Sequence, residues 1–474
     1  MCTGKRRKIK IAFIGGGSEM WAPTIIRDII LKNGMDQLDI EFALLDTCIE
    51  RSQSIKSLFD IKLKEWNVDR VRIYPTVNAP EALSNADFVI IAISTGRLDA
   101  MRHDLEIPEK YGIYHTVGDT SGPGGWSRAL RNIPVFKAYA EQIKEYCPDA
   151  YVLNYTNPMG ALTKILADEL GSSRVVGLCH GVFECYDILM PIFGVNSESE
   201  IQLRYGGLNH FFWILDMKVN GVDGYRFLRE KLDGRNFVEL MTEIHTDSMG
   251  WSSDKWLSGE LLERYGYLPY VGDRHTCEFF NCYMADLETQ ERLKLKRTSI
   301  ADRESMYSDA GESIRLWTEG KPGVKGIIDW TTLSREPSRE VAADIIKAIV
   351  FNQEFKDVVN MPNVGQIDNL PRGAVVETPG YVDGLGFTPL AIGDMPENLR
   401  ALIQPHAEVQ LRTVKAGLSG DMDEALAALA ADPICAHLAV SDINRMGLEL
   451  LDAHKEYLPQ FPDSQKMFLL SGVM

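Results

Sequence analysis

The sequence predicts an α/β protein built on a doubly wound parallel sheet, and three features of its first third lead to that prediction. Continuous apolar, β-branched runs alternate with amphipathic segments, the pattern of buried parallel strands separated by helices. The first apolar run ends in three consecutive glycines, and the second ends in an acidic residue, Asp46. After about Gly207 the alternation gives way to mixed segments, many of them helical, so we expect a mixed α+β second half.

The first third contains the strands and helices of such a sheet in alternation. Strands are expected at residues 8–16, 39–46, 69–76, 85–95 and 151–158, and helices at 21–33, 51–66, 128–150 and 161–171. Neither an internal repeat nor a low-complexity linker separates the two halves of the chain. We therefore expect two domains, residues 1–200 and 201–474, that pack as one body.

The stretch IAFIGGGSEMW joins the first expected strand to the first expected helix through Gly15, Gly16 and Gly17. Glycine lets the backbone approach a pyrophosphate, and the following helix presents free N–H groups and the positive end of its dipole. Ser18 belongs to the same loop, and Asp46 stands where an acidic residue accepts hydrogen bonds from the adenine ribose. These residues predict a Rossmann unit that binds NAD rather than NADP. The glycines depart from GxGxxG, so a plain glycine-rich turn is the alternative.

The composition is that of a globular protein with more than one domain. The chain has 474 residues, of which 45% are hydrophobic and 25% are charged. Its formal net charge of −17 argues against a nucleic-acid partner and against binding to an anionic membrane surface. No stretch reaches the ~18 apolar residues of a membrane span. Eight scattered cysteines do not form a disulfide framework, so we expect a cytoplasmic protein with reduced thiols.

Cysteine and histidine residues follow two apolar runs. Cys179 and His180 come directly after one run, in VVGLCHGV, and His210 lies at the mouth of another, in GGLNHFF. Parallel sheets place active sites at such strand ends, and a thiolate with an imidazole suits a divalent metal. A buried cysteine and a buried histidine without any ligand are the alternative, which the spacing leaves open.

Two further segments combine residue types that often form binding sites. The loop GYLPYVGDRHTCEFF carries Tyr270, Asp273, Arg274, His275 and Glu278. A carboxylate beside an arginine and a histidine suits a base next to an anion clamp, and a solvated loop is the alternative. The segment TSGPGGWSRALRNIP places glycine and proline before a helix that carries Arg128. Its backbone donors would reach a cofactor or substrate, and a plain turn with a helix cap is the alternative.

Seven short motifs occur in the order found in glycoside hydrolase family 4. They are FIGGGS, GPGG, NYTNPM, CHGV, GLNH, GDRH and NMPNVGQIDNLPRGAVVE. The resemblance extends over most of the chain, and GIYHTVGDTSGPGG with GDRHTCEF is most similar to the α-galacturonidase-like branch. The tetrapeptide CHGV resembles the α-glucosidase and α-glucuronidase pattern instead. The resemblance thus implies an α-uronide in a small oligosaccharide or glycoside, with a neutral α-glucoside or α-galactoside as the alternative.

The family hydrolyses glycosides by an unusual route, which the resemblance implies here. NAD+ takes hydride from C3 of the sugar, the ketone acidifies the C2 proton, and a base removes that proton. The glycosidic oxygen leaves by elimination, water adds, and the hydride returns, so NAD is not consumed. A divalent metal, Mn2+ in the family, holds the C2 and C3 oxygens. The implied fold is that of the lactate and malate dehydrogenases, and the implied assembly is a homodimer or homotetramer.

The family's functional residues match individual positions of this sequence. Cys179 and His210 match the metal ligands. His180 matches the residue that assists the leaving group, and Asn157 matches the asparagine that holds the substrate. Ligation through a cysteine thiolate also implies sensitivity to oxidation.

The base and the substrate clamp are expected in the GDRH loop. Phosphoglycosidase members use a tyrosine as the base, whereas here Asp273 is the preferred match and Tyr270 the alternative. Arg274 and His275, with Arg128, are expected to bind a carboxylate at C6 of the sugar. For Arg274, pairing with a neighbouring carboxylate is the alternative.

Two functions from other classes remain open at this point. An NAD-dependent dehydrogenase of the lactate/malate type would use the same fold, but it would consume NAD+ stoichiometrically. A non-catalytic NAD sensor would have no need for Cys179, His210 and Asn157 together. Accumulation of NADH during turnover distinguishes the dehydrogenase from the glycosidase.

Overall fold

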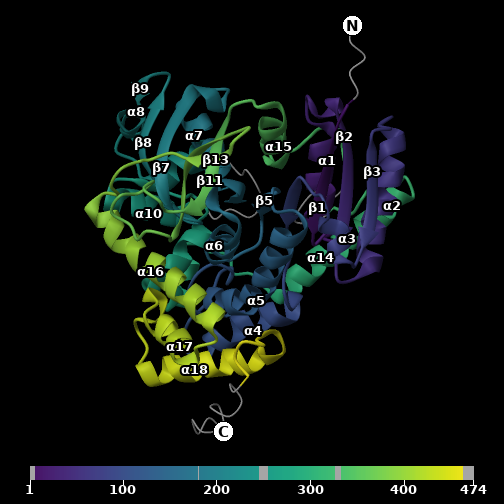
Figure 1. Cartoon of the computed structure of the whole chain (residues 1–474). Helices are drawn as coiled ribbons and strands as arrows, with labels where there is room; N and C mark the ends of the chain where they lie inside the picture. Colours follow the sequence, from purple (N-terminus) through teal and green to yellow (C-terminus); the bar gives the residue numbers. More distant parts are fainter. Residues whose placement is uncertain (1–5, 180, 245–254, 326–332, 463–474) are drawn as a thin grey trace.

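A computed structural model describes residues 6–179, 181–244, 255–325 and 333–462 of the chain, and Figure 1 shows their arrangement. The strands are β1 (Arg7–Ile14), β2 (Leu38–Leu45), β3 (Val71–Thr76), β4 (Phe88–Ile91), β5 (Tyr151–Asn154), β6 (Val175–Gly177), β7 (Ile201–Leu208), β8 (Phe211–Val219), β9 (Val222–Asp223), β10 (Leu268–Pro269), β11 (Phe355–Pro362), β12 (Val375–Asp383) and β13 (Gly386–Pro389). Within these residues thirteen strands join in one sheet, so the described chain has a single continuous backbone scaffold.

Helices precede and follow most of these strands. The α-helices are α1 (Ala22–Leu31), α2 (Ile49–Glu65), α3 (Ala79–Leu83), α4 (Arg97–Glu109), α5 (Gly122–Tyr146), α6 (Met159–Leu170), α7 (Gly181–Phe193), α8 (Gly224–Leu232), α9 (Phe237–Ile244), α10 (Trp256–Tyr265), α11 (Asp273–Thr276), α12 (Asn281–Met284), α13 (Leu287–Arg292), α14 (Ile300–Thr318), α15 (Ala342–Phe351), α16 (Glu397–Ser419), α17 (Met422–Ala430) and α18 (Val440–Ala453). Short 3-10 helices are η1 (Met35–Gln37), η2 (Ser172–Arg174), η3 (Glu198–Glu200), η4 (Cys277–Phe279), η5 (Pro433–Cys435) and η6 (Lys455–Tyr457). No helix in the described residues has the length and apolar character of a membrane span.

The strands from β3 to β6 are parallel and lie in the order β3-β2-β1-β4-β5-β6. This is the strand order of a Rossmann sheet. Along β1, Ile11 and Phe13 join one hydrophobic cluster while Ala12 and Ile14 join another. Successive side chains of a strand point to opposite faces, so each strand supplies both helical layers. The prediction of a doubly wound, Rossmann-type sheet is confirmed.

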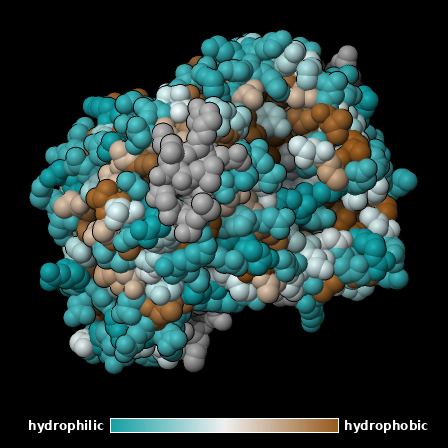
Figure 2. Space-filling view, turned by 90° about the horizontal axis from the view of Figure 1, so that it is seen from below, coloured by the Kyte–Doolittle hydropathy of each residue, from teal (hydrophilic) through white to brown (hydrophobic). Residues whose placement is uncertain are grey.

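Helices cover both faces of the sheet. One hydrophobic cluster contains residues of α1, α2, α14 and α15, and the other contains residues of α3, α5, α6, α16, α17 and α18. In Figure 1, α17 and α18 lie at the bottom of the molecule, beneath α4 and α5. The C-terminal helices therefore pack against helices of the N-terminal part. On the face shown in Figure 2, hydrophobic residues are interspersed among hydrophilic ones.

Beyond β6 the sheet continues with antiparallel strands, in the order β6-β11-β12-β7-β8-β10. Residues of β7 and β8 form a third hydrophobic cluster with residues of α7, α8 and α9. This arrangement confirms the expected mixed α+β second half. The division of the chain at residue 200 stays a prediction, because the sheet runs continuously past that point.

The helix of the TSGPGG segment begins earlier than predicted, at Gly122 rather than at Arg128. Gly122 has a φ of +63°, which favours glycine. A Cβ on Gly125 would lie 2.4 Å from the carbonyl carbon of Thr120. The glycines thus form the first turn of α5 and let it lie against the preceding loop. Helix α4, which packs beside α5, was outside the predicted elements.

Candidate active site

The glycine loop after β1 turns closely against two neighbouring strands. Gly15 has a φ of +86°, and a Cβ on it would lie 2.2 Å from the carbonyl oxygen of Ala92, just after β4. The N–H groups of Gly15 and Gly16 both donate to the carbonyl of Leu45, at 2.8 and 3.0 Å. A side chain at Gly15 would therefore displace backbone, which explains why glycine stands there.

Asp46 holds the same loop from the end of β2. Its Oδ2 accepts a hydrogen bond from the N–H of Gly17 at 3.0 Å, and its Oδ1 accepts one from Cys48 at 3.0 Å. The Ser18 hydroxyl accepts a hydrogen bond from Trp21 at 3.2 Å, just before α1. Each carboxylate oxygen of Asp46 has a further lone pair, so the residue can hold the loop and also accept from a ribose hydroxyl.

Asp119, His210 and His275 come together from three distant parts of the chain. One possible ligand atom of each lies within 4.8 Å of the others. Asp119 lies in the loop before α5, His210 lies between β7 and β8, and His275 lies in α11. The ring centroids of the two histidines are 4.0 Å apart. A carboxylate with two imidazoles at this spacing suits a divalent cation. We call these three residues the metal-binding cluster.

The hydroxyl of Thr120 bridges two members of this cluster. It donates to Oδ1 of Asp119 at 2.7 Å and lies 2.9 Å from Nδ1 of His210. A hydroxyl has one hydrogen, so Nδ1–H of His210 donates to Thr120, which leaves Nε2 as the nitrogen that could bind a metal. This is the tautomer that a metal-ligating histidine needs, with its second nitrogen fixed by a hydrogen bond.

The charges around the cluster favour its ligand forms. Burial raises the pKa of the Asp119 carboxyl, but His275, His210 and Arg128 outweigh that effect and hold the pKa below its usual range. Burial and the neighbouring His210 hold the pKa of His275 well below its ordinary value. At neutral pH the cluster therefore offers a carboxylate and a neutral imidazole, the forms that bind metal.

The sequence prediction placed Cys179 and His210 together as ligands. Among the described residues, the group that meets the 4.8 Å spacing contains His210 but not Cys179. Cys179 is half-buried after β6 and acts electrostatically on Tyr270, whose ring centroid lies 6.0 Å from that of His210. His180, predicted to assist the leaving group, lies outside the described residues.

Tyr270 lies beside the cluster with its hydroxyl directed to a carboxylate. The hydroxyl donates to Oε1 of Glu184 at 3.3 Å, and the ring centroid lies 6.3 Å from that of His275. Burial, with the charges of Glu184 and Cys179, holds the pKa of Tyr270 well above its ordinary value. The structure therefore brings Tyr270, the alternative base, next to both histidines.

Asp273, the preferred base, has a different surrounding. The residue is only 1% exposed, and its carboxylate lies at the start of α10. Oδ2 accepts from the N–H of Leu257 at 3.0 Å, and Oδ1 accepts from the N–H of Ser258 at 3.1 Å and from its hydroxyl. A carboxylate is stabilised there by the unpaired N–H groups and the helix dipole. This geometry gives Asp273 a structural task and does not support the prediction of a base.

Arg274, the predicted carboxylate clamp, also bonds within the protein. Its Nε donates to the carbonyl of Lys296 at 2.6 Å. Its Nη2 donates to the Thr298 hydroxyl at 2.6 Å and to the carbonyl of Thr116 at 3.3 Å. These bonds tie α11 to the segment before α14 and to the loop before α5. The geometry therefore does not support a substrate clamp at Arg274.

Asn157 and Arg128, from the NYTNP and GPGG motifs, lie beside the cluster, and their roles toward the substrate stay predictions. Nδ2 of Asn157 donates to Oδ2 of Asp119 at 3.4 Å, and Nε of Arg128 donates to the carbonyl of Asn157 at 3.1 Å. Arg303, on α14, interacts electrostatically with Asp119 and with Arg128. The structure thus gathers positive charge around one carboxylate.

Asp119, Thr120 and Arg303 were missed by the sequence reasoning. The glycines of GDTSGPGG are its most conspicuous feature, although an acidic residue followed by a hydroxyl residue in a tight loop is itself a possible ligand signal. Arg303 carries no such signal, because it lies in an ordinary helical stretch far from the other residues.

Comparison with known proteins gives matches over nearly the whole chain. Residues 10–195 match the family 4 glycosyl hydrolases, and residues 205–435 match the C-terminal domain of the same family. An α-galacturonidase of Thermoanaerobacterium saccharolyticum is 33% identical, with 96% of this chain and 97% of the relative covered. An α-galactosidase of Bacillus subtilis is 31% identical, with 95% of this chain and 99% of the relative covered.

Solved structures match in the same way. A Bacillus subtilis protein assigned as a glucosidase has a TM-score of 0.82 at 31% identity, with 94% of this chain and 100% of that chain covered. A 6-phospho-α-glucosidase from gut microorganisms, in complex with NAD and Mn2+, has a TM-score of 0.79 at 20% identity, with 96% and 99% covered. A malate dehydrogenase from Plasmodium falciparum has a TM-score of 0.50 at 12% identity, with 86% and 98% covered, in agreement with the predicted dehydrogenase-like fold.

Proposed function

The chain belongs to family 4 of the glycosyl hydrolases and is a glycosidase, and from that premise we propose that it cleaves an α-linked uronide with the help of NAD and a divalent metal. The observation that carries the proposal is the metal-binding cluster of Asp119, His210 and His275, with the cations Arg128 and Arg303 in electrostatic interaction with Asp119. Family membership does not support the alternatives of an ordinary dehydrogenase or an NAD sensor.

The residues of the nucleotide loop fit NAD. A Cβ on Gly15 would collide with the carbonyl of Ala92, so only glycine allows the tight turn between β1 and α1 that a pyrophosphate-binding loop needs. The carboxylate of Asp46 would accept from a ribose hydroxyl and repel a 2′-phosphate. The NAD and Mn2+ complex of the 6-phospho-α-glucosidase supports the same pair of cofactors here. When bound, NAD+ and Mn2+ would supply a reversible hydride acceptor and a centre that polarises neighbouring sugar oxygens.

We place the divalent cation at Asp119, His210 and His275, where a carboxylate and two imidazoles already lie close together. Asn157 donates to Asp119, and Thr120 fixes the tautomer of His210, so both residues orient the ligands. Cys179 stays a proposed ligand on the strength of the family resemblance, and the role of His180 at the leaving group also stays a proposal.

Removal of the C2 proton requires a base, and Tyr270 is the better candidate. Its hydroxyl donates to Glu184, which would receive the phenol proton as the oxygen takes the proton from C2. Asp273 is held by three hydrogen bonds from the start of α10. The Tyr270 ring stacks with that of His210, with centroids 6.0 Å apart, and lies tilted beside that of His275 at 6.3 Å.

A uronide is favoured over a neutral sugar by the charge near the cluster. The whole chain has a net charge of −17, so an anionic substrate needs a local cation to bind. Arg128 and Arg303 supply such charge beside Asp119, whereas His275, expected in the clamp, is assigned to the metal instead. The guanidinium of Arg274 donates hydrogen bonds to backbone carbonyls and a hydroxyl. We therefore assign the binding of the substrate carboxylate to Arg128 and Arg303.

The test is a panel of 4-nitrophenyl α-galacturonide, α-glucuronide, α-galactoside and α-glucoside, assayed with Mn2+, NAD+ and a thiol reductant. We expect cleavage of a uronide with no accumulation of NADH, and deuterium at C2 of the product in D2O. Faster cleavage of the α-galactoside would show that the substrate is a neutral sugar and not a uronide. Stoichiometric NADH formation would overturn the proposed mechanism. A homodimer or homotetramer and a cytoplasmic location stay predictions.

A further inference from the structure

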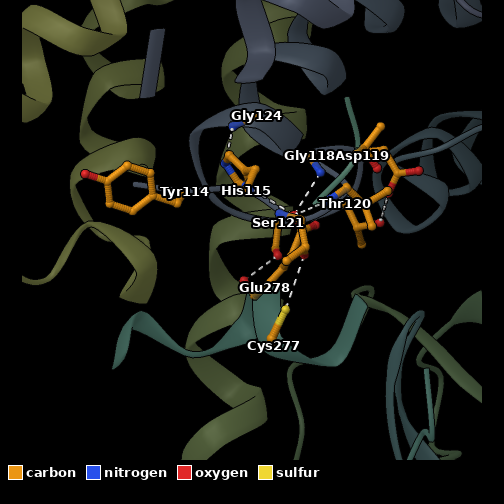
Figure 3. Close-up of polar contacts among 12 residues, drawn as sticks. Tyr114, His115, Gly118, Asp119, Thr120, Ser121, Gly124, Cys277 and Glu278 are labelled. Atoms are coloured by element: carbon orange, nitrogen blue, oxygen red, sulfur yellow. Dashed lines mark hydrogen bonds and ion pairs between the residues drawn. The ribbon is translucent and has the colours of Figure 1, made fainter. Parts of the chain in front are cut away.

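We infer that Glu278 is a positioning residue for the metal-binding cluster, because it holds the loop of Asp119 against the segment that carries His275. The inference rests on the metal site proposed above. Glu278 lies in η4, three residues after His275, and is fully buried. Figure 3 shows it beside Cys277, reaching toward the loop that precedes α5. In the described part of the chain its side-chain hydrogen bonds go to the loop and to His115, so we expect any effect on metal binding to act through the loop.

One oxygen of Glu278 collects several hydrogen bonds from this loop. Its Oε1 accepts from the successive backbone N–H groups of Thr116 at 3.0 Å, Val117 at 2.8 Å and Gly118 at 2.8 Å. Bonds from N–H groups to a buried carboxylate are charge-assisted and stronger than bonds between neutral groups. The carboxylate therefore fixes the path of the chain directly before Asp119.

Glu278 also holds the chain directly after Asp119 and Thr120. The hydroxyl of Ser121 donates to the backbone carbonyl of Glu278 at 2.8 Å. Gly118 and Ser121 are the direct neighbours of this pair, so both of its ends are bonded to Glu278. Gly118 has a φ of +73°, and its N–H reaches the carboxylate from that left-handed turn.

His115 extends the connection to helix α5. Its Nε2 accepts from the N–H of Gly124 at 3.2 Å, so the hydrogen is on Nδ1, which lies 3.1 Å from Oε1 of Glu278. Both side chains are fully buried. Glu278 is thus bonded to the loop, to its histidine and, through that histidine, to the first turn of α5.

This arrangement joins two ligands that are far apart in the sequence. Asp119 and His275 lie on separate segments, and a metal site loses affinity when the distance between its ligands relaxes. Glu278 is one short turn from His275 and is bonded on both sides of Asp119 and Thr120. A change that weakens these bonds should loosen the cluster without altering any ligand.

The test uses the full-length Glu278→Gln variant, whose side chain keeps the shape and one acceptor oxygen but loses the charge. The metal-free protein is titrated with Mn2+, by calorimetry or by the electron paramagnetic resonance of free Mn2+, and separately with NAD+. We expect Mn2+ to bind about 10- to 100-fold more weakly, the range of outer-shell changes at metal sites, with NAD+ affinity unchanged. Glu291→Gln, an exposed position on α13, is the matched control and should bind both as the unaltered protein does.

The outcomes separate this inference from the proposed function. If the unaltered protein does not bind Mn2+, the proposed metal site is wrong. If it binds Mn2+ and Glu278→Gln binds equally well, the positioning role is overturned, even if thermal stability falls. Should Glu278→Gln not fold, Ser121→Ala removes only the bond on the other side of the loop. We expect a several-fold loss of Mn2+ affinity in this variant, and an unchanged affinity overturns the inference.

Discussion

The Thr120 hydroxyl lies 2.9 Å from Nδ1 of His210 and donates its hydrogen to Asp119 at 2.7 Å. Replacing Thr120 with valine keeps the shape and removes the bridge, so His210 loses the partner that fixes its tautomer. We expect Mn2+ affinity to fall about 10- to 100-fold, measured by titration of the metal-free protein. Thr120→Ser retains a hydroxyl and should bind nearly as well as the unaltered protein. Equal affinity of the valine variant would show that His210 is not a ligand oriented in this way.

Asp46 is expected to select NAD+ over NADP+. Its carboxylate bonds to Gly17 and Cys48 and would repel a 2′-phosphate close to the ribose. Asp46→Asn keeps an acceptor oxygen but removes the charge, so the preference should narrow with little loss of the loop structure. Calorimetry with both dinucleotides measures the change in preference. Asp46→Ala also removes the hydrogen bonds to the loop, so it should lower the affinity for NAD+ as well. The prediction fails if the unaltered protein binds the two dinucleotides equally.

Tyr270 and Asp273 should respond differently to substitution. Tyr270→Phe removes the hydroxyl that bonds to Glu184, so we expect loss of deuterium exchange at C2 with an unchanged melting temperature. Asp273→Asn disturbs the bonds to Leu257 and Ser258, and should cost about 1–3 kcal/mol of stability. Nuclear magnetic resonance of the product and calorimetric unfolding give the two readouts. If Asp273→Asn abolishes exchange at an unchanged melting temperature, the base is Asp273.

A buried ion pair between Asp104 and Arg131 should make stability depend on pH in the acid range. The guanidinium donates to both carboxylate oxygens, at 2.7 and 2.5 Å, and Nε2 of His454 lies 3.1 Å from one of them. Burial raises the pKa of Asp104, but Arg131 and His454 outweigh it and lower the pKa to about 2, from 3.8. The folded pKa is the lower one, so this stabilisation is present above about pH 4 and is lost as the pH falls toward 2.

Asp104→Asn tests this dependence. It leaves the Arg131 guanidinium buried without its charge partner, which costs about 3–5 kcal/mol at neutral pH. We expect the difference in melting temperature between the two proteins to be constant from pH 7 to about 5 and to shrink below pH 4. An exposed pair such as Lys56 and Asp60 provides the control, because Asp60→Asn should change the melting temperature little. A difference that does not change with pH would contradict the assignment.

The sequence alone determined the fold and the family. Whether a segment forms a buried strand is set largely by residues close together in the sequence. The first strand is an example: Ile11 and Phe13 lie on one face of the sheet, and Ala12 and Ile14 lie on the other. The glycines after that strand predicted a nucleotide loop for the same reason, because a tight turn is a local property. His210, Asn157 and Arg128 each belong to a short motif, so the sequence singles them out, and their roles stay predictions.

Only the tertiary structure decided which polar side chains share the site. Asp273 and Arg274 have the residue types of a base and a clamp, yet α10 and the segment before α14 bind them. Asp119 followed by Thr120 is only a weak local signal, and Asp119 becomes a ligand candidate because Glu278, far along the chain, bonds to its loop near His275. Local patterns set the secondary structure through neighbouring residues. The partner of a buried charge is set by contacts between remote segments, and no short stretch of sequence records them.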